Sequence, residues 1–292
     1  MGSCSGRTVI ITGAGGGLGR AHVLAFAAEG AGVLVNDIRR DAAEAVAAEI
    51  ISRGGVAVAD NDDITTMAGA ERMVNAALQL SGEVHAVVNN AGNLRDRMFV
   101  NMTEEEWDQV MRVHLKGHFC LSNTLARRWR DQSKSGRPVD ARIVNTSSGA
   151  GLQGSLTQSN YSAAKAGIAA LTLVQAAELG RYGITVNAIA PSARTSMTEG
   201  AMAERVKRPD DGSFDWWDPA NVSALVVFLG SPLSKHITGR VFEIGGGQVS
   251  VCDGWRTGPV KDKGARWEPA ELGGVIEALI AASVPPQKVW GT

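Results

Sequence analysis

The stretch TVIITGAGGGLGR, residues 8–20, decides the fold of this chain. Its first five residues form an apolar-rich run, which is typical of a strand buried on both faces. Glycines follow in the spacing Gly13-x-x-x-Gly17-x-Gly19, and residues 17–29 carry a helical pattern. Glycines permit a tight turn and let backbone amides and a helix N-terminus approach a pyrophosphate. The stretch therefore predicts a nucleotide-binding unit with contacts from Gly13, Gly17, Leu18 and Gly19. A glycine-rich turn without a ligand is the alternative.

Strand-like and helical segments alternate along the first 248 residues. Short Val/Ile/Ala runs predict strands at residues 8–12, 32–37, 56–60, 85–90, 141–148, 184–191 and 239–247. Helical patterns lie between them, at residues 17–29, 40–53, 67–81, 103–131, 159–179 and 219–229. Unbroken apolar strands separated by helices are typical of a parallel sheet covered on both faces. We therefore predict an α/β fold, a single Rossmann-type doubly wound parallel sheet of about seven strands, over residues 1–248.

Residues 249–292 break this pattern and form a C-terminal extension. The extension contains Trp255, Trp267 and Trp290 and one amphipathic helix candidate at residues 269–282. A segment of this length cannot bury a core of its own. We expect it to pack on the main domain or on a neighbouring subunit.

The charge and the cysteine content of the chain limit which binding partners and which cellular compartment we expect. The 292 residues include 29 Lys or Arg and 30 Asp or Glu, a formal net charge of −1, which points to neither nucleic acid nor an anionic membrane as a partner. The three cysteines lie far apart and match neither a metal site nor a disulfide framework, as is typical of a reducing compartment. No signal peptide is recognised, and no apolar run approaches the roughly 20 residues that cross a bilayer. We expect a cytoplasmic protein without a metal.

Asp37 ends the second predicted strand. A carboxylate at this place can accept hydrogen bonds from the adenosine ribose hydroxyls, and it repels a 2′-phosphate. Asp37 therefore favours NAD over NADP as the cofactor, and Gly16, at a position where NADP-type loops often carry Arg, supports this choice. Arg39 and Arg40 lie close by and weaken the argument, and a plain turn residue is the alternative role for Asp37.

Tyr161 and Lys165 stand four residues apart at the start of the predicted helix 159–179. Side chains at this spacing share one helix face. A phenol has an ordinary pKa of about 10, too high for a base near neutrality, and a neighbouring ammonium favours the phenolate. Ser148, at the end of the predicted strand 141–148, can donate to a substrate oxygen. Together the three residues predict a general acid/base site; the alternative for the Tyr–Lys pair alone is a surface contact.

The sequence resembles the short-chain dehydrogenase/reductase family over residues 6–247. The matching pieces are TGAGGGLG (12–19), NNAG (89–92), Ser148, YSAAK (161–165) and NAIAP (187–191). The resemblance implies that Tyr161 is the catalytic acid/base and that Lys165 also holds the nicotinamide ribose. It further implies cofactor contacts from Asp63 and Ile64 at the adenine, from Asn90, Ala91, Gly92 and Pro191, and from Arg194 and Thr195 near the nicotinamide amide.

Five further pieces resemble the (3R)-hydroxyacyl-CoA dehydrogenase units of peroxisomal multifunctional enzymes of type 2, also described as 17β-hydroxysteroid dehydrogenases type 4. They are LVNDI (34–38), NNAGNLRDRMF (89–99), VHLKGHF (113–119), APSARTSMT (190–198) and VFEIGGG (241–247). The resemblance implies NAD-dependent oxidation of a secondary alcohol, foremost a 3-hydroxyacyl-CoA from fatty acyl or sterol side chains, by a homodimer or homotetramer. Alternatives are a 17β-hydroxysteroid dehydrogenase, a 3-oxoacyl carrier-protein reductase and, without catalysis, an NAD-sensing regulator.

Two positions depart from the common family pattern. His114 stands where most members have Asn, the fourth catalytic residue, whose backbone carbonyl holds a water that leads protons to the lysine. A backbone carbonyl survives this exchange, so the resemblance places His114 in the catalytic set and leaves the role of its ring open. After Pro191, Ser192 replaces the usual Gly, and the segment to Thr195 is one residue shorter.

The substrate side is expected at residues 196–219, where the family has a mobile loop. Trp216 and Trp217 either wall an apolar pocket or pack inside a connector between helices. Arg205, Lys207 and Arg208 either meet the phosphates of CoA or form a solvated face, and we favour the solvated face.

Overall fold

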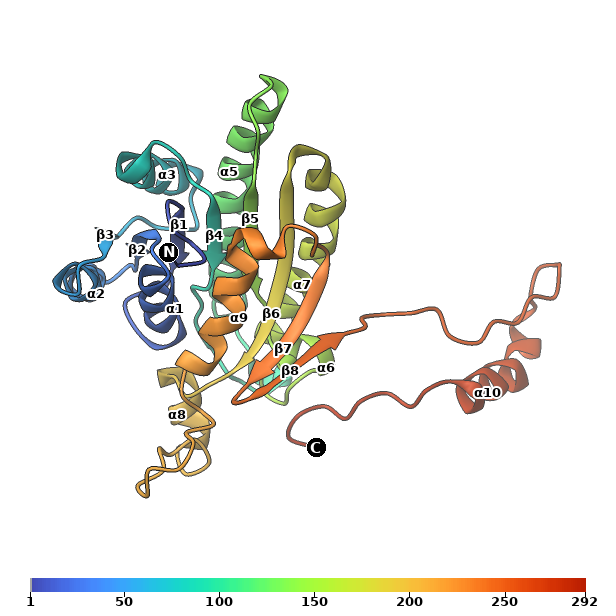
Figure 1. Cartoon of the computed structure of the whole chain (residues 1–292). Helices are drawn as coiled ribbons and strands as arrows, with labels where there is room; N and C mark the ends of the chain where they lie inside the picture. Colours follow the sequence, from blue (N-terminus) through green and yellow to red (C-terminus); the bar gives the residue numbers. More distant parts are fainter. Residues whose placement is uncertain (1) are drawn as a thin grey trace.

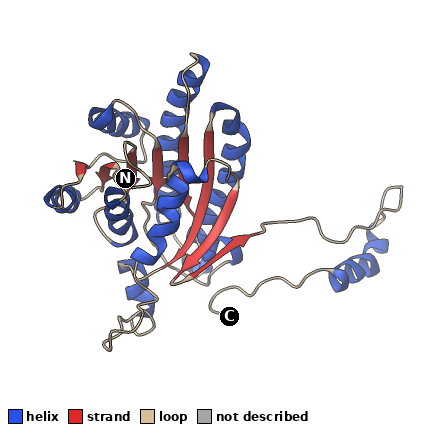
Figure 2. Cartoon of the chain, viewed as in Figure 1, coloured by secondary structure: helices blue, strands red, loops and turns tan. Residues whose placement is uncertain are grey.

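A single sheet organises the protein, whose computed structural model describes residues 2–292 apart from the side chains of residues 200–202. The sheet has eight strands in the order β3-β2-β1-β4-β5-β6-β7-β8 (Figure 2). Every neighbouring pair is parallel except β7 and β8, which are antiparallel. The strands are β1 Thr8–Thr12, β2 Gly32–Asn36, β3 Val56–Asp60, β4 Ala86–Asn89, β5 Ala141–Thr146, β6 Ile184–Ser192, β7 Arg240–Gly245 and β8 Gln248–Cys252. The predicted doubly wound α/β fold is confirmed.

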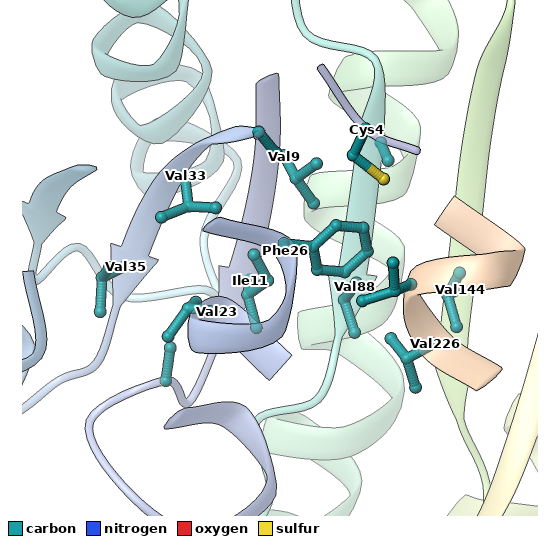
Figure 3. Packing of buried hydrophobic residues seen from close by; sticks show 14 of the residues in the cluster. Cys4, Val9, Ile11, Val23, Phe26, Val33, Val35, Val88, Val144 and Val226 are labelled. Carbon is teal, nitrogen blue, oxygen red and sulfur yellow. The ribbon is translucent and has the colours of Figure 1, made fainter. Parts of the chain in front are cut away.

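Helices cover both faces of the sheet (Figure 1). One face packs against α1 (Gly17–Ala28), α2 (Arg40–Ser52) and α9 (Ala220–Gly230), around Val23, Phe26 and Val226. Figure 3 shows these side chains against the buried valines of β1, β2, β4 and β5. The other face packs against α3 (Met67–Ser81), α5 (Gly117–Lys134) and α7 (Ser159–Leu179). Two buried layers explain why the strands are continuous apolar runs.

The eighth strand exceeds the predicted count of about seven. β8 follows β7 through a two-residue loop, Gly246-Gly247, and Gly246 has a φ of +54°. A two-residue hairpin loop of this kind requires left-handed backbone, which glycine adopts without a steric cost. β8 lies at the exposed edge of the sheet, so it lacks the apolar run that marks the buried strands. The sheet therefore continues past residue 248, and the division into 1–248 and 249–292 stays a prediction.

The predicted helix 103–131 is interrupted at one place. It consists of α4 (Glu104–Met111), a π-helical turn over Arg112–Lys116, and α5. The amide of Gly117 donates to the carbonyl of Arg112, five residues back. A π-turn inside an α-helix frees backbone groups and is frequent at functional sites. The interruption falls on His114.

The switch in strand order lies between β1 and β4. The chain moves outward through β2 and β3 on one side of β1, and through β4 to β8 on the other. Ligands of doubly wound sheets bind outside the carboxyl ends of the strands at such a switch point. This position is where the glycine-rich turn after β1 lies.

The C-terminal extension runs outward from the domain and returns to it (Figure 1). The predicted helix 269–282 is present as a 3-10 turn, Pro269–Glu271, followed by α10 (Leu272–Ala282). The remaining helices are α6 (Gly149–Gln153) and α8 (Ser196–Met202). Among the described residues, no helix combines the length and the apolar content that a membrane span requires.

Candidate active site

The glycine-rich turn after β1 forms a close-packed cradle. Gly13 has a φ of +63°, and a Cβ on it would lie 2.8 Å from Cα of Ala91. A Cβ on Gly19 would lie 2.7 Å from Nδ2 of Asn90. The side chain of Thr195 faces Gly17, at 3.4 Å from where its Cβ would be. The turn therefore admits only glycine at positions 13 and 19.

The N-terminus of α1 is open to a ligand. The helix begins at Gly17, directly after Gly16, and no side chain among the described residues caps it. Its first turn contains no acidic residue. Uncapped amides at a helix N-terminus attract a phosphate through their hydrogens and the helix dipole. The cradle, including Leu18 in this first turn, therefore fits the pyrophosphate of a dinucleotide.

Asp37 lies at the edge of the cradle, one residue beyond β2. Its Oδ2 accepts a hydrogen bond from the amide of Gly15 at 3.0 Å. Its Oδ1 accepts from the amide of Arg39 at 3.0 Å and from its Nε at 3.2 Å. These bonds orient the carboxylate and leave acceptor capacity for ribose hydroxyls. Arg39, which weakened the sequence argument, is paired with Asp37 itself.

Asn90 joins the ends of β1 and β4. Its Nδ2 donates to the carbonyl of Thr12 at 2.9 Å, and Oγ1 of Thr12 accepts from the amides of Asn90 and Ala91 at 3.0 and 3.1 Å. The segment NNAG thus braces the sheet beside the cradle.

Asp63 and Ile64 lie in the turn between β3 and α3. Oδ1 of Asp63 accepts from the amide of Thr65 at 2.8 Å. The Ile64 side chain packs at the start of α5, where a Cβ on Gly117 would lie 2.7 Å from its Cδ1. Only the backbone of Ile64 is left for a ligand, and its adenine contact stays a prediction.

Arg194 is occupied by the chain itself. Its guanidinium forms an ion pair with Asp215 and donates to the carbonyl of Val206 at 2.8 Å. Its amide donates to the carbonyl of Trp217 at 2.7 Å. These contacts fasten the segment 203–218 to the end of β6, where Pro191 is paired with Ile244 of β7. The contacts of Arg194 and Pro191 with a nicotinamide therefore stay predictions.

The four predicted catalytic residues meet around Tyr161. Its phenol lies beside the hydroxyl of Ser148, which also caps α6 by accepting from the amide of Ala150 at 3.2 Å. Nζ of Lys165 lies 5.5 Å from the centre of the Tyr161 ring. The His114 ring lies on the opposite helix, with its centre 5.2 Å from that of Tyr161. The structure thus brings together residues from the end of β5, from α7 and from the π-turn.

Burial dominates the titration of Tyr161 and Lys165. It raises the pKa of Tyr161 above its ordinary value, and the neighbouring Ser148 hydroxyl opposes this only in part. Burial also lowers the pKa of Lys165, to about 7. Nζ of Lys165 donates to the carbonyl of Thr146 at 2.6 Å. Lys165 is therefore a group that exchanges a proton near neutrality.

His114 is a buried, neutral histidine. Burial and the charge of Lys165 lower its pKa to about 3. Its Nε2 lies 2.8 Å from the carbonyl oxygen of Asn93 and donates to it in the tautomer that carries the hydrogen there. A Cβ on Gly92 would overlap the imidazole. Within the described chain, Nδ1 of His114 is buried without a hydrogen-bond partner, so a water near the ring would have a ready contact.

Three supporting residues were missed from the sequence. Asn160 accepts from the amide of Tyr161 at 2.7 Å and donates to the carbonyl of Arg95 at 3.0 Å. Thr146 holds Lys165, and Asn93 holds His114. The only sequence feature that indicates a role for Asn160 is its position directly before Tyr161. Thr146 and Asn93 act through backbone groups, which no residue type reveals.

The tryptophan pair of the substrate segment is packed. The Trp216 indole lies against β7, where a Cβ on Gly245 would lie 2.6 Å from its Cη2. The Trp216 and Trp217 rings lie 4.6 Å apart, and the guanidinium of Arg205 lies over Trp217 at 5.8 Å. Lys207 forms an exposed ion pair with Asp210. These contacts favour a packed connector and a solvated face over a CoA-phosphate site.

Known proteins similar to this chain are dehydrogenases of one family. The sequence profile of short chain dehydrogenase matches residues 7–207. Hydroxyacyl-CoA dehydrogenase ChsB1 of Mycobacterium tuberculosis is 43% identical over 302 residues, 99% of this chain and 93% of that protein. Peroxisomal multifunctional enzyme type 2 of Mus musculus is 40% identical over 261 residues, 86% of this chain but only 33% of that longer enzyme.

Solved structures agree with this relation. A short chain dehydrogenase from Mycobacterium avium is 53% identical, has a TM-score of 0.91 and covers 100% of both chains. A 3-ketoacyl-(acyl-carrier-protein) reductase from Brucella melitensis, complexed with NADH, is 29% identical with a TM-score of 0.73, covering 84% of this chain and 98% of that one. The chain therefore belongs to the short chain dehydrogenase family of oxidoreductases.

Proposed function

We propose that this protein is an NAD-dependent 3-hydroxyacyl-CoA dehydrogenase. The observation that carries the chemistry is the convergence of Ser148, Tyr161 and Lys165 at the carboxyl end of the sheet, on the side of the glycine cradle. The substrate class is supported by similarity to a hydroxyacyl-CoA dehydrogenase along nearly its whole length. It is supported further by similarity to one third of a peroxisomal multifunctional enzyme.

Each catalytic residue has a distinct part in the oxidation. Ser148 donates to the oxygen of the substrate alcohol and holds it beside the Tyr161 phenol. Tyr161 takes the hydroxyl proton in its phenolate form as the carbonyl forms, and the positive charges of Lys165 and of a bound nicotinamide ring would favour that phenolate. A nicotinamide dinucleotide bound in the cradle would accept the hydride from the carbinol carbon. Lys165, with a pKa near 7, passes the proton onward and returns Tyr161 to its starting state.

NAD is proposed over NADP because of Asp37. Its carboxylate is fixed by the amides of Gly15 and Arg39 at the end of β2. A 2′-phosphate at this place would meet a like charge. Among the described residues, Arg39 is the only arginine whose guanidinium bonds to Asp37. Because it is paired with that carboxylate, it is not free to bind a 2′-phosphate.

We propose that the protein acts in the cytoplasm as a homodimer or homotetramer. Its substrate is a small acyl-CoA or steroid-like molecule, and we expect neither nucleic acid nor a membrane as a partner. Cys4 and Cys120 are buried free cysteines, which suits a reducing compartment.

A turnover panel tests the proposal. The purified protein is assayed with NAD and NADP against 3-hydroxyacyl-CoAs of several chain lengths, steroid side-chain thioesters, 17β-estradiol and, in reverse, a 3-oxoacyl carrier protein. We expect the highest kcat/KM with NAD and a 3-hydroxyacyl-CoA. Turnover of estradiol alone, or of the carrier-protein substrate alone, would replace the acyl-CoA assignment with that alternative. NAD binding with no turnover of any substrate would support the regulator instead.

A further inference from the structure

A carboxylate that the proposed mechanism does not use lies beside the catalytic residues. Asp96 stands between Arg95 and Arg97 in the loop from β4 to α4, and its side chain is exposed. Nε2 of Gln158, the N-cap residue of α7, donates to Oδ2 of Asp96 at 2.9 Å. Gln158 precedes Tyr161 by three residues, so the carboxylate lies next to the turn of α7 that carries the proposed acid/base.

The backbone on both sides of Asp96 is fastened to the start of α7. The carbonyl of Arg95 accepts from Nδ2 of Asn160 at 3.0 Å, and the amide of Arg97 donates to the carbonyl of Thr157 at 2.7 Å. Thr157 has a φ of +67° and is the one non-glycine residue with a positive φ in the described part of the chain. A β-branched residue keeps such a conformation only where its surroundings fix it. Asp96 is therefore presented by two segments that hold each other in place.

The arginines next to Asp96 do not neutralise its charge. The guanidinium of Arg97 pairs with Glu106 of α4 at 2.8 Å, and Nε of Arg95 donates to Oε1 of Gln109 at 2.9 Å. Both side chains are thus engaged by α4. Among the described residues, neither these arginines nor another basic side chain forms an ion pair with Asp96.

The charge of Asp96 acts on Tyr161. Burial is the main cause that raises the pKa of this phenol, and the charge of Asp96 raises that pKa further. Lys165 and the neutral His114 are the other titratable groups that face the ring. A helix N-terminus attracts anions, and α7 has no acidic residue of its own in its first turn. Because Asp96 already places a negative charge there, a second anion would be repelled.

A free 3-hydroxy acid would bring such an anion to this place. In the proposed mechanism the substrate oxygen lies beside Ser148 and Tyr161, and C1 of the substrate is only two bonds from the carbinol carbon. A carboxylate at C1 would therefore be repelled by Asp96, whereas a thioester carries no charge at C1. The phosphates of CoA lie at the far end of its pantetheine arm, beyond the roughly 8 Å over which charges interact in physiological salt.

We propose that Asp96 is a specificity-determining residue that selects thioesters over free 3-hydroxy acids by charge repulsion. Asp96 acts through its charge and forms no bond to the reacting atoms. The selection rests on the proposed function, because it concerns the substrate of that reaction. The effect of the Asp96 charge on Tyr161 does not rest on the proposed function and is measured without a substrate.

The ionisation of Tyr161 measures this charge effect. The chain has two tyrosines, so in the Tyr182→Phe background the phenolate absorbance belongs to Tyr161 alone. Asp96→Asn removes the charge in this background, and its amide oxygen can still accept from Gln158. Asp108→Asn, an exposed change on α4, is the control. Circular dichroism verifies that each protein stays folded over the pH range that is titrated.

We expect Tyr161 to ionise at a pH lower by about half a unit or more in Asp96→Asn, because a charge that opposes the phenolate has been removed. The control should ionise at the same pH as the parent protein. An unmoved midpoint in Asp96→Asn overturns the proposal, since the charge then does not reach the site.

A matched pair of substrates measures the selection. A free 3-hydroxy acid and its methyl ester differ in charge at C1 but little in size. The ratio of kcat/KM for the ester to that for the acid is measured in wild type, Asp96→Asn, Asp96→Glu and Asp108→Asn. We expect Asp96→Asn to lower this ratio by about fivefold or more, mainly through a higher kcat/KM for the acid. Asp96→Glu, which restores the charge, and the control should keep the wild-type ratio.

The two measurements separate the failures. An unchanged ratio in Asp96→Asn overturns the selection, whatever the midpoint of Tyr161 does. An equal fall of the ratio in Asp108→Asn also overturns it, because any exposed carboxylate would then have the same effect. A wild type that oxidises none of these alcohols refutes the proposed function, and the selection falls with it. The titration of Tyr161 then still decides whether the charge of Asp96 acts at the site.

Discussion

The imidazole of His114 stands edge-on to the phenol of Tyr161, with ring centres 5.2 Å apart and planes at 85°. The imidazole is neutral near pH 7, because burial lowers its pKa to about 3. Its Nε2 is engaged by the backbone of Asn93. We therefore expect His114 to support Tyr161 by packing and to hold the segment after NNAG, without its ring gaining or losing a proton during turnover.

Replacing His114 by Asn tests this role. We expect kcat to fall by less than about tenfold, and the pH dependence of kcat/KM to keep its shape between roughly pH 6 and 9, because no group that titrates there has been removed. His114→Phe, which cannot donate to Asn93, should lose more activity and stability. A displaced limb of the pH profile in the Asn variant would show that the ring carries protons.

Replacing Tyr161 by Phe removes the proposed acid/base. Turnover should fall by about 10²–10⁴-fold, the usual contribution of a positioned proton-transfer group. NADH affinity, measured by fluorescence titration, should stay within a factor of about three, because only the hydroxyl is lost. The chain has one other tyrosine, so Tyr182→Phe is the matched control and should retain wild-type turnover. Near-normal turnover in Tyr161→Phe would rule out the mechanism.

Acid should destabilise the protein through buried histidines. His22 is fully buried, with Nδ1 at 2.9 Å from Oγ of Ser223, and burial lowers its pKa to about 3. Between pH 6.5 and 3 the unfolded chain binds a proton there and the native state does not, so stability falls as the pH falls. His22 alone should cost about 2 kcal/mol between pH 7 and 5.

Urea unfolding at pH 7 and 5 measures this effect. The variant His22→Gln should lose less stability than wild type on going to pH 5, whatever its stability at pH 7. The exposed His236 provides the control, since His236→Gln should keep the wild-type pH dependence. Equal pH dependence in all three proteins would contradict the account of His22.

Replacing Asp37 by Ser should relax the choice between the two dinucleotides. The change removes the like charge that a 2′-phosphate would meet and the fixed acceptor for the ribose hydroxyls. We expect the ratio of kcat/KM for NAD to that for NADP to fall by about tenfold or more. Asp41→Ser, an exposed change in the first turn of α2, serves as the control. An unchanged ratio would show that another group selects the cofactor.

Local sequence determined the fold and the centre of the site. The apolar runs at residues 8–12 and 141–146 specify buried parallel strands, and glycines at 13 and 19 are the only residues that the turn admits. Tyr161 and Lys165 are brought to one face by helical spacing alone. These features depend only on residues a few positions apart in the sequence, so they can be predicted from the sequence alone.

Tertiary structure decided what depends on distant neighbours. The partner of Arg194 is Asp215, across a connector whose path no local pattern specifies. The pKa of Tyr161 rises where a neighbouring lysine predicted a fall, because burial is a property of the packed molecule. Trp290 reaches the loop of Ser148 only because the chain returns after a long excursion. Solvent exclusion and contacts between remote segments arise on folding, and they set the electrostatics and the edges of this site.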